Sequence, residues 1–226
     1  MALDFPAVAP ALELAAKLEG ACTWFKVGLE LYLAAGNSVI EQLRQRGHSV
    51  FLDLKLHDIP NTVAGAVRSA SSAGASLLTV HSLGGPAMIE AAAAELAKLS
   101  APPKLLAVTL LTSMDTQQMR SVGLIAESEA QVLMLAQMAR AAGADGVVAS
   151  PLETAALRKT LGPDSLLVIP GIRPANSAAD DQKRTATPAA AIADGASMLV
   201  VGRPITQAAD PATAARAILD QIAEAL

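Results

Sequence analysis

The stretch FLDLKLHDIPNTV, residues 51 to 63, begins with the pattern of a strand and ends with the first residues of a helix. Side chains alternate along a strand, so Phe51, Asp53 and Lys55 are predicted on one face and the leucines between them on the other. The leucine face requires an apolar layer of helices, whereas the opposite face carries an acid and a base side by side. After a turn, a helix is predicted from Val63 to Ala73.

The charged face of this strand has two interpretations. A pair such as Asp53 and Lys55 is most often found on a solvated edge strand. However, helical patterns flank the strand on both sides, which is typical of a parallel sheet covered by helices on both faces. Charges in such a sheet are costly unless they are paired or functional. The strand is therefore predicted to carry chemistry.

Short aliphatic strands alternate with helices along the whole chain. Strands are predicted at residues 1–4, 23–27, 50–55, 77–81, 104–110, 146–149, 166–169 and 198–201. Helices are predicted at residues 10–18, 30–46, 63–73, 86–99, 127–142 and 151–161, then after Thr187-Pro188 and after Asp210-Pro211. This count and rhythm predict an α/β fold, a (β/α)8 barrel. The alternative is an open doubly wound sheet, but no G-x-G-x-x-G follows the first strand.

Composition limits the classes of protein that need to be considered. The 226 residues suffice for one domain with a full core, and a single domain spanning residues 1–226 is predicted. Hydrophobic residues make up 52% and aromatic residues only 2%, so aliphatic side chains must fill that core. The net charge is −4 and there is no basic run, so nucleic acid is not expected as a partner.

The sequence favours a cytoplasmic protein. Cys22 is the single cysteine, so no intrachain disulfide forms, which fits a reducing compartment. The first ten residues lack the basic and apolar regions of a signal peptide. No apolar run reaches membrane-spanning length without a charge, so no membrane association is expected.

Polar residues follow the predicted strands at their carboxyl ends, where (β/α)8 barrels place their catalytic groups. The candidates are Asp4, Lys26, Asp53, Lys55, Asp58, His81, Thr112, Arg173 and Arg203. Two lysines and up to three carboxylates are thus expected at one mouth. Such a cluster shifts pKa values, and a substrate anion placed against one of its carboxylates would be destabilised.

The residues after the eighth predicted strand favour phosphate binding. Barrels of this kind commonly hold a phosphate at the loops after strands seven and eight. Gly202 offers a backbone amide there and Arg203 a guanidinium, both suited to that task. The alternative for Arg203 is a surface arginine without a ligand.

The histidines are predicted to be structural. His81, at a strand end, is more often a hydrogen-bonded structural residue than a catalyst, and His57 is expected to shape its loop. Neither has the spacing of metal ligands: no H-x-H or H-x-x-x-H pattern and no cysteine partner exists, so no metal is predicted.

At this point the motifs resemble a known family. The segment DLKLHDIPNT, residues 53 to 62, resembles the signature of the orotidine 5′-phosphate decarboxylase family. The resemblance continues, in that family's order, at LD (3–4), FKVG (25–28), VTLLTS (108–113), PGIRP (170–174), DQ (181–182) and VGRPIT (201–206). It thus covers essentially the whole chain. The D-x-K-x-x-D pattern by itself is shared with related sugar-phosphate barrels, but the combination is much more specific.

The resemblance implies cofactor-free decarboxylation of orotidine 5′-monophosphate to uridine 5′-monophosphate and carbon dioxide. It implies that Lys55 donates a proton to C6 of the pyrimidine and that Asp53 lies beside the substrate carboxylate. Lys26 and Asp58 complete the charged array, with Asp58 contributed by the other subunit of a homodimer.

The resemblance also assigns the binding residues. It implies that Asp4 and Lys26 hold the ribose, that Thr112 lies near the base and that Arg203 binds phosphate with the Gly202 amide. Gln182 is expected to bridge base and phosphate on a closing loop. Arg173, Ile59 and Thr62 are expected to line the same site, Thr62 from across the dimer interface.

Two rival functions remain open at this point. One is a related barrel acting on a sugar phosphate, such as a hexulose-phosphate synthase or a ketogulonate-phosphate decarboxylase, enzymes that use magnesium. The other is a non-catalytic barrel that binds nucleotide phosphate. Such a protein would keep Gly202 and Arg203 but would have no use for Asp53 and Lys55.

Overall fold

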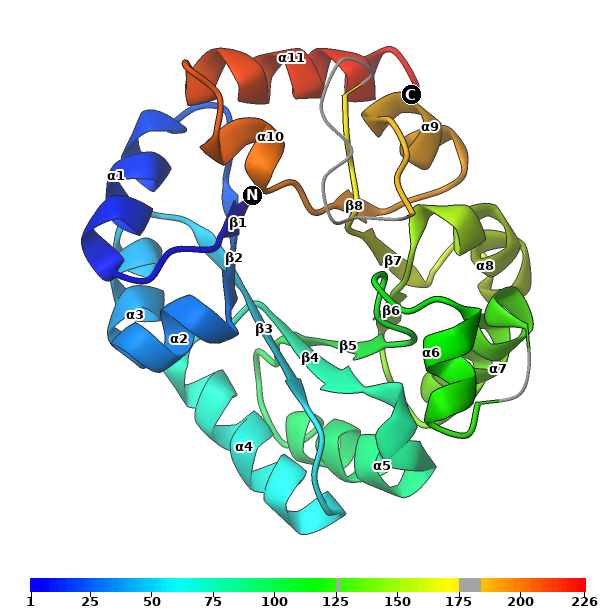
Figure 1. Cartoon of the computed structure of the whole chain (residues 1–226). Helices are drawn as coiled ribbons and strands as arrows, with labels where there is room; N and C mark the ends of the chain where they lie inside the picture. Colours follow the sequence, from blue (N-terminus) through cyan, green and yellow to red (C-terminus); the bar gives the residue numbers. More distant parts are fainter. Residues whose placement is uncertain (125–126, 175–183) are drawn as a thin grey trace.

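The computed structural model describes residues 1–124, 127–174 and 184–226 as a ring of parallel strands inside a ring of helices (Figure 1). The strands are β1 (Ala2–Leu3), β2 (Trp24–Gly28), β3 (Ser49–Leu56), β4 (Leu77–His81), β5 (Lys104–Val108), β6 (Gly146–Val148), β7 (Leu166–Ile169) and β8 (Met198–Leu199). They follow one another around the sheet in chain order, and every neighbouring pair is parallel. The predicted (β/α)8 barrel is therefore confirmed.

A backbone hydrogen bond joins the first and last strands of the ring. The Ala2 N–H donates to the carbonyl oxygen of Val201, just beyond β8, at 2.7 Å. On its other side β1 pairs with β2, with Ala2 opposite Lys26. The short first strand thus lies between β8 and β2 and places the residue after it, Asp4, at the rim beside both.

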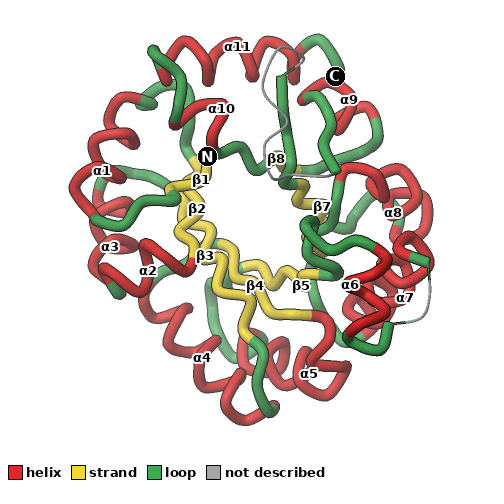
Figure 2. Tube along the Cα trace, in the orientation of Figure 1, coloured by secondary structure: helices red, strands yellow, loops and turns green. Residues whose placement is uncertain are grey.

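The helices lie outside the strands, as the tube view shows (Figure 2). They are α1 (Val8–Lys17), α2 (Leu29–Ala35), α3 (Ser38–Gln45), α4 (Pro60–Ala73), α5 (Gly85–Leu96), α6 (Thr116–Ser121), α7 (Ser128–Ala141), α8 (Thr154–Leu161), α9 (Pro188–Ala193), α10 (Arg203–Thr206) and α11 (Pro211–Ala223), with 3-10 turns η1 (Ser82–Gly84) and η2 (Pro151–Glu153). Among the described helices, none is long and apolar enough to cross a membrane.

The helix predicted at residues 30–46 is wrong as a single element. The structure has α2 and α3 instead, separated at Gly36 and Asn37. Gly36 has φ of 59°, a left-handed conformation that glycine adopts without a steric penalty and that interrupts a helix. The Tyr32 hydroxyl donates to Asn37 Oδ1 at 3.0 Å and fixes the corner.

Two short helices were not predicted. In α6, the Asp115 side chain accepts from the Gln118 N–H, and the Gln118 side chain accepts from the Asp115 N–H, a reciprocal capping box. In α10, Arg203–Thr206 forms a single turn directly after β8. The capping-box spacing was readable in the sequence, whereas a one-turn helix leaves no periodic pattern to detect.

Two apolar layers explain the strand alternation. The larger layer lies between strands and helices and includes Leu52, as expected for the leucine face of β3. The smaller layer fills the inside of the barrel with Phe51, Leu77, Leu106 and Val168, all at most 3% exposed. This inner plug closes the barrel from within, so a cavity inside the barrel must lie above it, among the residues that follow at the strand ends.

Candidate active site

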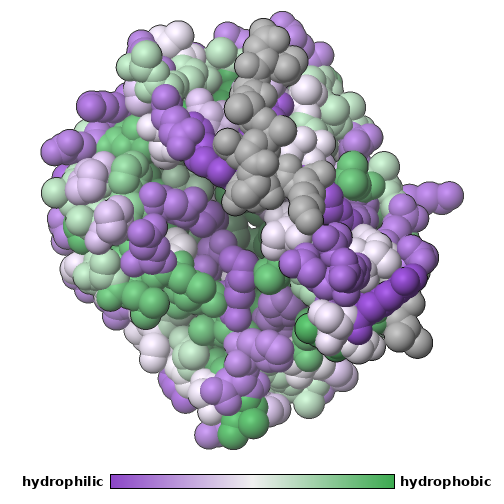
Figure 3. All heavy atoms as spheres, in the orientation of Figure 1, coloured by the Kyte–Doolittle hydropathy of each residue, from purple (hydrophilic) through white to green (hydrophobic). Residues whose placement is uncertain are grey.

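A cavity of about 390 Å³ opens at the carboxyl ends of the strands, within the range usual for small-molecule sites. The predicted residues that line it are Asp4, Lys26, Asp53, Lys55, Thr112, Arg173, Gly202 and Arg203. They come from β2 and β3 and from the segments that follow β1, β5, β7 and β8, so eight residues far apart in sequence meet at one place. Polar residues also gather around the hollow at the centre of this face (Figure 3).

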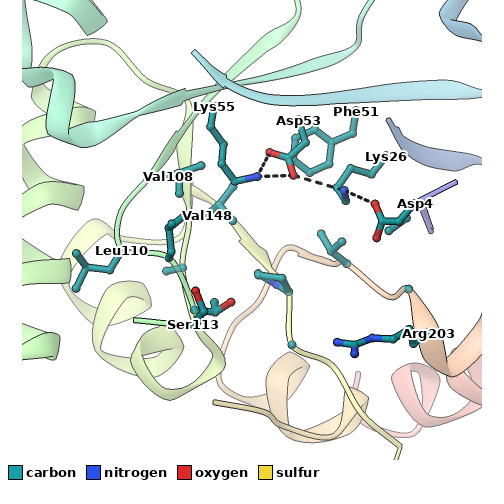
Figure 4. A pocket seen from close by; sticks show the side chains of 18 of the residues that line it. Asp4, Lys26, Phe51, Asp53, Lys55, Val108, Leu110, Ser113, Val148 and Arg203 are labelled. Carbon is teal, nitrogen blue, oxygen red and sulfur yellow. Dashed lines mark hydrogen bonds and ion pairs between the residues drawn. The ribbon is translucent and has the colours of Figure 1, made fainter. Parts of the chain in front are cut away.

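Four of these residues form a row of alternating charge along one wall (Figure 4). Lys26 Nζ lies 3.2 Å from Asp4 Oδ1 and 3.5 Å from Asp53 Oδ2. Lys55 Nζ donates to both oxygens of Asp53 at 2.9 Å. Alternating signs make the row stable as a whole, while its outermost groups remain open to the cavity: the Asp4 side chain is 62% exposed and that of Lys55 32%.

Asp53 is the buried centre of the row. Burial alone would raise the pKa of its carboxyl group, but the charges of Lys26 and Lys55, with hydrogen bonds from Lys55 and Thr79, outweigh burial and lower the pKa. Asp53 is therefore a fixed negative charge at neutral pH. An anionic group brought beside it would meet electrostatic repulsion in a partly desolvated place.

Gly28 leaves room for the ion pair between Lys26 and Asp4. It lies opposite Asp53 in the β2–β3 ladder. A Cβ atom at this position would lie 3.1 Å from Lys26 Nζ and 3.5 Å from Asp4 Oδ1. A larger residue would therefore push against the ammonium group, which explains why the FKVG segment ends in glycine.

The backbone of β3 is irregular where it carries the charges. Leu52 pairs with Leu78 and Leu56 with Val80, so four steps along β3 match two steps along β4. Within this bulge Lys55 has φ of 52°, the one positive value for a non-glycine residue in the described ranges. A left-handed conformation costs an ordinary residue roughly 1–2 kcal/mol. The bulge re-aims the Lys55 side chain toward Asp53 at the mouth.

Arg203 lies across the cavity from Lys55 and Asp53 (Figure 4). It begins α10, directly after Gly202, whose backbone also lines the cavity. Arg173, after β7, joins the same lining and donates from Nη1 to the Ile172 carbonyl oxygen at 2.9 Å. Two guanidinium groups and a glycine backbone thus border the cavity, away from the Asp53 carboxylate of β3.

Four predicted candidates lie outside this cavity: His81, at the end of β4, and three residues after β3. Asp58 and Ile59 belong to the exposed segment between β3 and α4, Thr62 lies in the exposed first turn of α4, and the Ile59 side chain is 67% exposed. Asp58 Oδ1 accepts from the Ile59 N–H at 2.6 Å instead of bonding its own Lys55. Gln182 lies outside the described residues.

The histidines have local partners. His81 Nδ1 accepts from the Leu83 N–H at 3.3 Å, and the ring stacks on His57 with centroids 5.5 Å apart. Burial first, and then the charges of His57 and Lys55, lower the pKa of His81. These contacts agree with the structural roles predicted for both rings. In the described ranges, no group of three or more histidine, cysteine, aspartate or glutamate side chains is placed to hold a metal.

The sequence reasoning missed the apolar wall and one hydroxyl. Val108, Leu110, Val148 and Val200 line the cavity from β5, β6 and the ends of β5 and β8. Their inward alternation was a readable signal, but aliphatic residues at strand ends look like ordinary core. Thr79 of β4 is fully buried and donates to Asp53 Oδ1 at 3.0 Å; nothing in the sequence places it opposite that carboxylate.

Comparison with families of known proteins gives one match over nearly the whole chain. The model of the family described as "Orotidine 5'-phosphate decarboxylase / HUMPS family" matches residues 1–218.

Individual relatives also match this chain over nearly its whole length. A protein of Halorhodospira halophila named orotidine 5′-phosphate decarboxylase is 52% identical over 225 residues, covering 100% of this chain and 95% of the relative. One of Moorella thermoacetica with the same name is 50% identical, covering 98% and 90%. The crystal structure of orotidine 5′-phosphate decarboxylase from Lactobacillus acidophilus is 42% identical with a TM-score of 0.87, covering 98% of this chain and 96% of that one.

Proposed function

The chain belongs to the orotidine 5′-phosphate decarboxylase / HUMPS family, and on this basis we propose that it converts orotidine 5′-monophosphate to uridine 5′-monophosphate and carbon dioxide. The reaction is the last step of de novo uridine 5′-monophosphate synthesis, and no cofactor takes part. The observation that carries the proposal is the row Asp4–Lys26–Asp53–Lys55 on one wall of a cavity whose other side carries Arg203.

The proposed chemistry uses the ammonium group of Lys55. The bond between C6 and the carboxylate breaks, carbon dioxide leaves, and the electron pair stays on C6. A cation aimed at C6 stabilises this developing carbanion and then transfers a proton to it, which forms the C6–H bond of the product. Lys55 regains its proton from solvent, to which its side chain is 32% exposed.

Asp53 has two proposed roles in the same step. It orients Lys55 through hydrogen bonds of 2.9 Å to both of its oxygens. Its fixed negative charge also lies where the substrate carboxylate must approach, so the repulsion between them is relieved as carbon dioxide departs. The interaction is thus more favourable in the transition state than in the ground state, which is the requirement for raising kcat.

The opposite end of the cavity is proposed to bind the nucleotide. Arg203 and the Gly202 amide hold the phosphate, Arg173 and Thr112 line the site, and Asp4 with Lys26 holds the ribose. Gln182 is proposed as a further contact to base and phosphate. Phosphate contacts remote from C6 supply binding energy that positions the reacting carbon against Lys55.

The test is direct. Purified protein mixed with orotidine 5′-monophosphate should change the ultraviolet absorbance as the pyrimidine loses its carboxylate, and the product should be uridine 5′-monophosphate. Activity should persist in EDTA. Loss of activity in EDTA, together with turnover of a hexulose or ketogulonate phosphate, would favour the magnesium-dependent barrels instead. Binding of the nucleotide without turnover would identify a binding protein.

We further propose a homodimer in which Asp58 and Thr62 complete the partner's site, with Ile59 between them. The support is geometric. The segment from Asp58 to Thr62 is exposed and does not line the cavity of its own chain. Pro60 favours an extended conformation at Ile59, whose ψ is 151°, so the segment leads away from Lys55. A two-fold interface would exchange both segments at once.

Subunit mixing tests the dimer. Inactive Lys55→Ala and Asp58→Ala proteins are mixed under conditions that let subunits exchange. In a mixed dimer one site inherits both defects and the other neither, so random reassortment restores about a quarter of the sites. If activity stays absent although exchange is demonstrated by mass, Asp58 acts within its own chain and the shared site is refuted.

The proposed location is the cytoplasm, and residues 1–226 are proposed to form one catalytic domain. Cys22 as the single cysteine agrees with the location, and a sheet with strands from Ala2 to Leu199 agrees with one domain. Activity recovered in a membrane or periplasmic fraction would contradict the first statement. Two separate unfolding transitions would contradict the second.

A further inference from the structure

A single side chain of β4 lies opposite the bulge of β3. The ladder is regular up to the pair Leu52–Leu78 and resumes at Leu56–Val80. Between these pairs, three residues of β3 face Thr79 alone. Thr79 is fully buried, and residues on either side of it belong to a regular strand that pairs with β5 without interruption. The rigid strand is therefore β4, and the irregular one is β3.

The Thr79 hydroxyl makes two hydrogen bonds across the bulge. It accepts from the backbone N–H of Lys55 at 2.9 Å and donates to Asp53 Oδ1 at 3.0 Å. The same Oδ1 accepts from Lys55 Nζ at 2.9 Å. The four groups close a ring: Lys55 backbone, Thr79 hydroxyl, Asp53 carboxylate and Lys55 ammonium.

The ring fixes the direction of every proton in it. An ionised carboxylate only accepts, and an ammonium only donates. A hydroxyl carries one proton and two lone pairs, so the Thr79 oxygen accepts from the Lys55 N–H while its single proton is donated to Asp53. The left-handed backbone of Lys55, with φ of 52°, is the conformation in which its N–H and its Nζ both reach this ring. One hydroxyl thus holds the backbone and the side chain of the same lysine.

We propose that Thr79 is a positioning residue: its hydroxyl anchors the β3 bulge to the rigid strand β4, so that Lys55 and Asp53 are held at their working separation before substrate binds. Thr79 touches no substrate, because it is buried beneath the cavity. The kinetic consequence rests on the proposed function, whereas the anchoring of Lys55 does not. Arg203, at the phosphate end, lines the cavity and Thr79 does not, so removing the Thr79 hydroxyl should affect the placement of Lys55 rather than the binding of phosphate.

Two substitutions test the proposal. Thr79→Val keeps the branched shape and volume but removes both hydrogen bonds. Misplacing a reacting group by about an ångström costs up to roughly 100-fold in rate, so kcat for orotidine 5′-monophosphate should fall about 10- to 100-fold. KM should stay within about threefold, because the phosphate contacts are untouched. Thr79→Ser restores the hydroxyl and should return kcat to within about threefold of the wild type.

Thr109→Val is the matched control. Thr109 is also fully buried and directly follows β5, but its hydroxyl donates only to the Val148 carbonyl oxygen, at 3.1 Å. The variant loses a buried hydrogen bond without touching the ring, so it should lower the unfolding temperature while leaving kcat within about threefold. If Thr79→Val and Thr109→Val lower kcat equally, or if Thr79→Ser is as slow as Thr79→Val, Thr79 is merely structural and the proposal is wrong.

A second measurement is independent of activity. In protein labelled with [15N]lysine, the Lys55 backbone amide should exchange its hydrogen with solvent at least about tenfold faster in Thr79→Val than in wild type or Thr79→Ser. Unchanged exchange would overturn the proposal whatever the kinetics. If wild-type protein does not turn over orotidine 5′-monophosphate, the proposed function fails, but this exchange measurement still decides whether Thr79 anchors Lys55.

Discussion

Lys55→Ala is the substitution that tests the proposed chemistry most directly. It removes the ammonium group that lies 2.9 Å from both oxygens of Asp53 and that faces the cavity. Asp53 keeps Lys26 at 3.5 Å and the Thr79 hydroxyl at 3.0 Å, so the carboxylate is not left without partners. The variant should therefore fold, and its defect should be confined to the reaction.

The magnitude follows from two contributions of Lys55. An ammonium about 4 Å from a developing carbanion attracts it by roughly 4 kcal/mol at an effective dielectric near 20, which is about a 10³-fold effect on rate. Proton donation typically contributes about 10²- to 10⁴-fold more. Because the side chain is 32% exposed and water screens part of its charge, we reduce the electrostatic contribution to about 10²-fold and take about 10²-fold for proton donation. We therefore expect kcat to fall by at least about 10⁴-fold.

The assay combines turnover with binding. Loss of the pyrimidine carboxylate is followed by absorbance, and uridine 5′-monophosphate binding by titration calorimetry, where affinity should change far less than kcat because Arg203 is intact. Lys104→Ala is the matched control. Lys104 also pairs with an aspartate, Asp145, at 2.9 Å, but it begins β5, at the opposite end of the barrel. Its removal should leave kcat within about twofold.

Residual turnover decides the matter. If Lys55→Ala protein, free of wild-type contamination, turns over within tenfold of the wild type, Lys55 is not the proton donor. The electrostatic role proposed for the row would then fall with it. Lys55→Arg separates the two contributions, because it keeps a cation but donates a proton poorly; activity well above that of Lys55→Ala would assign the difference to charge.

Three further predictions follow from other parts of the molecule. Arg203→Ala should raise KM for the nucleotide about 100-fold yet hardly affect the nucleoside lacking phosphate, and equal losses on both substrates would show a structural role. Folding lowers the pKa of Asp53, so its ionised form contributes stability above about pH 4, and this stability is lost as the pH falls through the pKa of the folded state. The Asp53→Asn variant should therefore be less stable than wild type in urea unfolding, and the difference should shrink below about pH 4. A difference that stays constant with pH would contradict this linkage. Arg158→Ala should lower the unfolding free energy by on the order of 3–5 kcal/mol and leave kcat unchanged. Its guanidinium donates hydrogen bonds to four carbonyl oxygens near the start of β7 and β8, those of Gly162, Pro163, Ser165 and Gly195. A loss of activity without a loss of stability would contradict this structural role.

The site was predictable to the extent that strand ends converge. A barrel brings the carboxyl ends of its strands to one mouth whatever their sequence separation, so Asp4, Lys26 and Asp53 could be grouped before any distance was known. The same rule failed for Asp58, which follows a strand end but lies outside the cavity of its own chain. Whether a loop residue turns inward or outward depends on backbone angles that a strand count does not contain.

Local signals predicted local structure well. Asp210 was expected to begin the last helix, and its side chain accepts from the N–H groups of Ala212 and Thr213. Ser150, directly before the helix predicted at residues 151–161, accepts from the Leu152 N–H, although the first turn, η2, is a 3-10 helix. Such contacts span two or three residues, so the residue types that make them are adjacent in the sequence.

The sequence by itself determined the barrel, its order of strands, the charged face of β3 and the group of residues at its mouth. The alternation of side chains along a strand and of strands with helices along the chain can be read over short stretches of sequence, and the topology follows from these two patterns. Only the tertiary structure decided how the charges are paired. Lys55 and Asp53 share a face by alternation, but the bulge at Lys55 and its anchor, Thr79, depend on the register between β3 and β4. The strand register brings Thr79 next to Lys55, 24 positions away in the sequence, and next to Asp53, 26 positions away. This register is set by the packing of the whole sheet rather than by either segment alone.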